Sequence, residues 1–181
     1  MEVGAGSTSL PRRAMLCRCF ALMGVVPQKW AATRSRVTTF RDLTRPVAIP
    51  LRHVAEPWQP LAFDAWAVDA SGSDLLLKGM LVRTARPPDP ADGLTAVCLT
   101  CPHEICYVNL VEEPGAAELD VVAPEHPVFV CPCHFSSFDP RAEGARLGGP
   151  TTRGLFRFGF EVKGEVVRIA QIEEEILRFL A

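Results

Sequence analysis

The chain has 181 residues, of which 48% are hydrophobic and 22% charged, and its formal net charge at pH 7 is -2. This length suits one globular domain with some residues to spare. The near-neutral charge gives no basic surface that would attract a phosphate backbone, so nucleic acid is not expected as a partner. The 16 prolines and 13 glycines are spread through the chain, which indicates many turns and short strands and favours an all-β fold.

The first 32 residues have the pattern of an export signal. Arg12 and Arg13 stand directly before an apolar stretch over residues 14–26, an arrangement that resembles a twin-arginine signal. The stretch is shorter than the ~20 residues of a membrane-spanning helix, so a spanning anchor is not expected. We predict an exported protein at the periplasmic face of the cytoplasmic membrane, with residues 1–32 either cleaved or kept as an interfacial anchor. A polar, basic linker is predicted over residues 33–46.

From about Val47 onward, short apolar segments alternate with turn-rich ones. The clearest strand covers residues 155–162, where alternate residues from Phe156 to Val162 share one apolar face. Lys163 and Gly164 then predict the turn of a hairpin with residues 165–170, and helical spacing over 171–181 predicts a short amphipathic helix. Further strands are predicted at 47–51, 61–68, 75–82, 94–99 and 128–130, with loops at 86–92 and 112–127.

Two short segments each combine a thiol with an imidazole. They are Cys101-Pro102-His103 and Cys131-Pro132-Cys133-His134. Two sulfurs and two nitrogens suit either tetrahedral zinc or a [2Fe–2S] centre in which two histidines replace two cysteines on one iron. Zinc modules usually place two or more residues between paired ligands. The single residue inside the first pair therefore favours the iron–sulfur centre.

The surrounding residues resemble a known family. Residues 101–106, Cys-Pro-His-Glu-Ile-Cys, and residues 131–136, Cys-Pro-Cys-His-Phe-Ser, are similar to the two cluster-binding boxes of Rieske proteins. Residues 148–150, Gly-Gly-Pro, are similar to the loop that covers the cluster in that family. The resemblance spans roughly the C-terminal half of the chain. It implies an antiparallel β-sandwich over 47–181 with an inserted two-loop cluster-binding subdomain at about 98–154.

The resemblance also implies a role for each residue of the boxes. One [2Fe–2S] cluster would be held at its inner iron by two cysteines and at its outer iron by two histidines, which would face the redox partner as the catalytic groups. A serine after the second histidine would donate a hydrogen bond to a bridging sulfide, and two further cysteines would form a disulfide, which agrees with an oxidising compartment. The inner-iron ligands would be Cys101 and Cys131, and the outer-iron ligands His103 and His134. The serine is Ser136, and the disulfide would join Cys106 to Cys133.

Three departures from the family pattern bear on which complex the protein serves. Glu104 stands where quinol-oxidising members often have leucine, Phe135 replaces a common glycine, and Phe138 replaces the tyrosine of high-potential members. Outside the boxes, Cys98 is predicted to be a core residue. His53 and His126 match no ligand position and are predicted to be ordinary surface or loop histidines.

The first functional prediction is the Rieske electron-transfer subunit of a respiratory bc-type quinol:cytochrome c reductase. Its partners would be cytochrome b, a c-type cytochrome and quinol. The alternative is the small electron-relay subunit of an arsenite oxidase-like molybdenum enzyme, partnered by a molybdopterin large subunit, because residues 134–140 resemble the second box of that family. A free-standing ferredoxin-like carrier is a third class, which the paired cysteines of the boxes disfavour.

Overall fold

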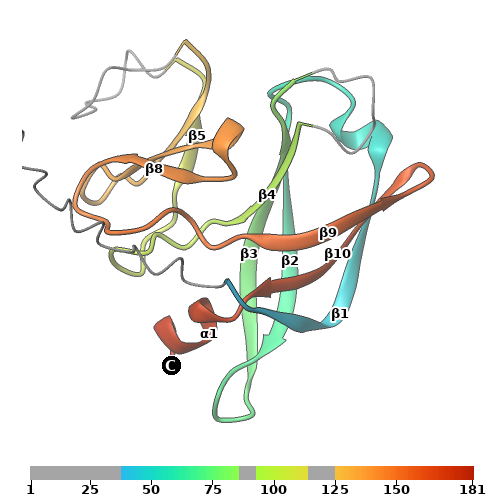
Figure 1. The fold of residues 1–181 in the computed structure, drawn as a ribbon, viewed down its shortest axis with the longest axis vertical. Helices are drawn as coiled ribbons and strands as arrows, with labels where there is room; N and C mark the ends of the chain where they lie inside the picture. Colours follow the sequence, from blue (N-terminus) through green and yellow to red (C-terminus); the bar gives the residue numbers. More distant parts are fainter. Residues whose placement is uncertain (1–37, 86–92, 114–124) are drawn as a thin grey trace, which may run out of the picture. The chain divides into compact units, whose positions relative to one another are not determined.

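The computed structural model describes residues 38–85, 93–113 and 125–181 (Figure 1). The predicted export signal, the loop at 86–92 and most of the loop at 112–127 lie outside these residues. No helix in the described ranges is long and apolar enough to cross a membrane. The elements are the strands β1 Phe40–Pro50, β2 Pro60–Val68, β3 Asp74–Arg83, β4 Leu94–Cys98, β5 Asn109–Val111, β6 Val128–Val130, β7 Ser137–Asp139, β8 Ala145–Gly148, β9 Phe158–Lys163 and β10 Val166–Glu173, the 3-10 turns η1 Leu51–Val54 and η3 Pro140–Ala142, and the helix α1 Glu175–Phe179.

Six of these strands form an antiparallel sheet, called here the large sheet, in the order β4-β3-β2-β1-β10-β9. Its two end strands meet, because Val97 bridges to Arg157 and the Cys98 amide donates to the Phe156 carbonyl at 2.7 Å. The sheet therefore folds over on itself and encloses an apolar core. Alternation along β2 turns Phe63, Ala65 and Ala67 into that core and leaves the residues between them exposed.

The predicted linker is wrong from Phe40 onward, because residues 40–46 belong to β1. This strand pairs with β10 from Phe40 opposite Glu173 to Pro50 opposite Val166, with a register shift between Asp42 and Val47. Most of its side chains are exposed, which explains why the sequence shows no apolar periodicity here. Backbone hydrogen bonds to β10, and not burial of side chains, hold this segment in the sheet.

The C-terminal hairpin is confirmed, with the turn at Lys163 and Gly164, but the helix is shorter than predicted. β10 continues to Glu173, and Ile172 pairs with Phe158 on β9 instead of starting a helix. The five-residue α1 begins only at Glu175 and buries Ile176. The all-β expectation with a short C-terminal helix is thus confirmed.

The chain between β4 and β9 forms a second sheet, called here the small sheet, in the order β5-β6-β7-β8. Three of its strands, β5, β7 and β8, were not predicted, because they are three or four residues long and mix polar with apolar residues. The equally short β6 was predicted because all three of its residues are apolar. A second cluster of buried residues joins this sheet to β3 and β4 of the large sheet. Its buried members are Val82, Val97, Cys101, Val108, Phe129, Cys131, Phe138 and Leu155.

Candidate metal centre

The first cysteine–histidine pair lies in a tight loop that follows β4. Thr100 bridges to Tyr107, and the Cys101 amide donates to the Cys106 carbonyl at 2.7 Å. This pairing closes the base of the loop, and the residues at its tip, Glu104 and Ile105, are exposed. Cys101 is 1% exposed, whereas His103 is only partly buried and Glu104 is exposed. The loop thus presents its thiol inward and its imidazole toward the surface.

The second pair follows β6 in a loop of similar design. The Cys131 amide donates to the Ser136 carbonyl at 2.8 Å, and the Phe135 amide donates to the Cys131 carbonyl at 2.9 Å. Phe135 has a φ of +57°, in the left-handed region that favours glycine. The backbone here is therefore one that the more common glycine would adopt without strain.

The two loops bring the predicted ligands together in pairs of like chemistry. The rings of His103 and His134 lie 4.9 Å apart between centroids and nearly perpendicular, at 87°. Burial raises the pKa of the Cys101 thiol, and the neighbouring Cys131 thiol raises it further. The Nδ1 atom of His134 also lies 3.7 Å from a Glu104 carboxylate oxygen.

The other two cysteines of the loops form the expected disulfide, Cys106 to Cys133, with their Cα atoms 6.6 Å apart. The sulfur of Cys131 lies within 4.8 Å of both bridged sulfurs. Cys101 and Cys131 are nevertheless free thiols. The disulfide ties one ligand loop to the other and leaves the two buried thiols available for a metal.

A third loop, residues 148–154, packs against the second one. Gly149 has a φ of +83°, and a Cβ atom there would lie 2.8 Å from the Ser136 nitrogen and 2.9 Å from the Phe135 oxygen. Glycine is therefore required both by the backbone conformation and by the close approach. The Thr151 amide donates to the Ser136 hydroxyl at 3.4 Å, and Ser136 is fully buried.

The chemistry of these donors fits a [2Fe–2S] cluster with mixed ligation. The thiols of Cys101 and Cys131 are buried and form no disulfide. The two imidazoles are less buried, and the side chain of His134 is 47% exposed. Thiolates would hold one iron and neutral imidazoles the other. Zinc accepts the same donor types, so the donors alone do not distinguish the two metals.

Cys98, His53 and His126 lie outside the two cluster-binding boxes and are not expected to bind the metal. Cys98 is fully buried in the core of the large sheet, as predicted, and burial raises its thiol pKa. His53 is exposed, as predicted. His126 lies in the loop before β6, as predicted, but it is not a surface residue, because its ring is 11% exposed, stacks on Trp58 at 5.5 Å and hydrogen-bonds Asp139 at 2.9 Å. No sequence spacing connects Trp58 with His126, so the pattern of the chain gave no signal for this contact.

Comparisons with known proteins place the sequence of this chain among iron–sulfur domains. A family model described as the Rieske [2Fe–2S] domain matches residues 67–169. A curated relative from Haloferax mediterranei, named for a Rieske subunit of a respiratory nitrate reductase, is 37% identical over 78 residues, which are 43% of this chain and 30% of the relative. The chain thus spans less than a third of that relative's length. The plasma membrane Rieske protein PetC3 from Synechocystis PCC 6803 is 25% identical, with a TM-score of 0.34, over 59% of this chain and 84% of that one.

Proposed function

The chain belongs to the Rieske [2Fe–2S] domain family, and we propose that it relays single electrons within an oxidoreductase complex through one cluster held by Cys101, Cys131, His103 and His134. When bound, such a cluster supplies reversible one-electron chemistry at a potential set by its surroundings. The residues of this chain determine how the cluster is held, how water is kept from it and where electrons enter and leave.

The observation that carries this proposal is the gradient of burial across the four ligands. Cys101 and Cys131 are 1% and 2% exposed, whereas the side chain of His134 is 47% exposed. The burial of both thiols excludes water from the cysteine side of the site. The exposed edge of the imidazole gives a redox partner close access on the histidine side. Two apolar side chains of the first loop and its return, Ile105 at 73% exposed and Tyr107 at 57%, offer a contact surface for that partner.

The first candidate for the complex is a bc-type quinol:cytochrome c reductase in a respiratory chain, with cytochrome b and a c-type cytochrome as partners. The Cys106–Cys133 disulfide supports a place on an oxidising side of a membrane, because such bonds persist outside the reducing cytosol. Export by the twin-arginine signal to the periplasmic face would agree with it. Phe138 in place of tyrosine suits a low-potential quinol as the donor.

The second candidate is a relay subunit of a different respiratory or molybdenum enzyme. The relative from Haloferax mediterranei carries the name of a respiratory nitrate reductase subunit. The second box also resembles that of arsenite oxidase small subunits. In either enzyme the cluster would pass electrons to or from a large catalytic subunit and would not react with quinol itself.

Purification of the native complex through a tag on this chain discriminates between the two candidates. Co-purified cytochrome b, together with reduction of the cluster by an added quinol analogue, supports the first. A large catalytic subunit without cytochrome b, and no reaction with quinol, supports the second. A chain that purifies with neither partner would contradict both.

The ligand assignment has a separate test in two buried cysteines. Cys131→Ser should abolish the iron and the visible absorbance of the protein, whereas Cys98→Ser should keep both, because Cys98 packs in the core of the large sheet. Equal iron contents in the two variants would contradict the assignment.

A further inference from the structure

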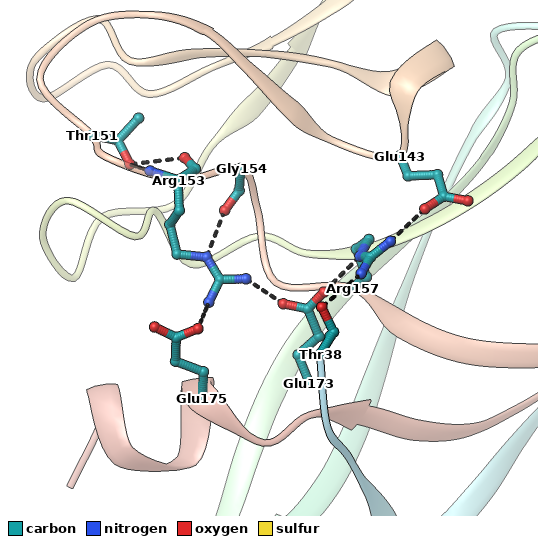
Figure 2. A network of polar contacts seen from close by, with 8 residues as sticks. All are labelled: Thr38, Glu143, Thr151, Arg153, Gly154, Arg157, Glu173 and Glu175. Atoms are coloured by element: carbon teal, nitrogen blue, oxygen red, sulfur yellow. Dashed lines mark hydrogen bonds and ion pairs between the residues drawn. The ribbon is translucent and has the colours of Figure 1, made fainter. Parts of the chain in front are cut away.

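A network of charged side chains joins the third loop and the segment after it to the end of the large sheet (Figure 2). At its centre is Glu173, a buried carboxylate at the end of β10, which accepts hydrogen bonds from Arg153 and Arg157. Arg153 also pairs with Glu175 at 2.6 Å, and Arg157 also pairs with Glu143 next to the small sheet. One buried anion thus fixes two arginines from the chain that connects the two sheets.

Arg153 is held more tightly than an ion pair alone would require. Its Nε atom donates to the Gly154 carbonyl at 3.0 Å, and its guanidinium lies 4.1 Å from the centre of the Phe156 ring. Because the guanidinium is planar, its hydrogen bonds and its contact with the ring together favour one orientation of the Arg153 side chain. Loss of the Glu173 carboxylate would remove a charged, buried partner and leave the exposed Glu175, so the guanidinium would be held less firmly.

The network continues from Arg153 to the metal centre through Thr151. The Thr151 hydroxyl donates to the Arg153 carbonyl at 3.0 Å and accepts from the Arg153 amide at 3.4 Å. The Thr151 amide donates to the Ser136 hydroxyl oxygen. A hydroxyl has one proton to donate and can accept as well, so Ser136 keeps its own proton for another acceptor.

We propose that Glu173 is a positioning residue for the cluster. Through Arg153 and Thr151 it sets the direction in which the Ser136 hydroxyl points its proton. The inference rests on the proposed function and on the role that the family resemblance implies for Ser136, whose hydroxyl would donate a hydrogen bond to a sulfide of the bound cluster. That bond favours the reduced cluster, which carries the extra negative charge, so Glu173 contributes to the reduction potential although it touches no ligand.

The test is a double-mutant cycle on the reduction potential, measured by protein-film voltammetry on the cluster-loaded protein at fixed pH. The shift caused by Ser136→Ala is compared in the wild type, in Glu173→Gln and in Glu174→Gln. Both glutamine variants remove one negative charge, and the direct effect of that charge cancels because the Ser136→Ala shift is measured within each background. Glu174, however, pairs with Arg41 and Arg178 instead.

The Ser136→Ala shift should be less than half as large in Glu173→Gln as in the wild type, and unchanged in Glu174→Gln. Equal shifts in all three backgrounds would overturn the role of Glu173 and leave the proposed function intact. A wild-type protein that binds no iron–sulfur cluster would instead overturn the proposed function.

A second variant keeps the inference testable if Glu173→Gln does not fold. Arg153→Lys retains the positive charge and loses the planar fork, so it should reduce the Ser136→Ala shift in the same way. Hydrogen exchange at the Thr151 amide should also be faster in Arg153→Lys than in Glu174→Gln. Equal exchange rates and an undiminished Ser136→Ala shift would refute the inference.

Discussion

Replacing Phe138 with tyrosine is expected to raise the reduction potential of the cluster by about 65–130 mV. Phe138 is fully buried on β7 and belongs to the same apolar core as Cys101 and Cys131, so a new hydroxyl would be enclosed near the thiolates. A hydrogen bond to a charged group contributes about 1.5–3 kcal/mol. A tenfold change in equilibrium is about 1.36 kcal/mol, or about 59 mV for one electron, which gives the expected range.

Voltammetry at fixed pH measures this shift, and Phe158→Tyr provides a matched control. Phe158 is also buried, but it packs on Phe63 in the core of the large sheet. A hydroxyl buried there without a partner should cost about 1–3 kcal/mol of stability and leave the potential unchanged. If Phe138→Tyr folds, binds its cluster and shows the wild-type potential, the ring does not face a ligand sulfur and the reasoning fails.

Three further substitutions test the loops around the metal. Cys106→Ser should speed cluster loss, followed by the decay of visible absorbance, far more than Cys98→Ser, because the disulfide holds the ligand loops together; equal rates would contradict this. Phe135→Gly should raise the midpoint of thermal unfolding, because relief of left-handed strain of about 1–2 kcal/mol exceeds the glycine entropy cost of about 0.5–1 kcal/mol; a lower midpoint would count against strain. Gly149→Ala should lower the iron content, since its Cβ would lie 2.8 Å from the Ser136 nitrogen; wild-type iron content would show that the third loop can shift.

The parts of the fold that the sequence predicted are those with local signals. Alternating aromatic residues and a glycine turn were enough for the β9–β10 hairpin. β1 was missed over residues 40–46 because its stability comes from pairing with β10, more than 100 residues away, and its outer residues are polar. The boundary between β10 and α1 was misplaced because Ile172 fits both a strand and a helical period.

The same distinction holds for the candidate site. Each cysteine–histidine pair lies within four residues of sequence, so the spacing located both loops, and the resemblance to Rieske proteins implied the disulfide partners. The contacts that support the loops could not be found this way. Glu173 reaches Arg153 across 20 residues, and Trp58 reaches His126 across 68; both contacts depend on how the sheets pack and leave no spacing pattern in the chain.

The metal content of the protein tests the central claim most directly. Anaerobically purified protein should contain two irons and two acid-labile sulfides per chain, and the reduced form should give the electron paramagnetic resonance signal of a [2Fe–2S] centre with mixed sulfur and nitrogen ligation. Cys101→Ser should lose both iron and sulfide. Stoichiometric zinc with no acid-labile sulfide would contradict the account.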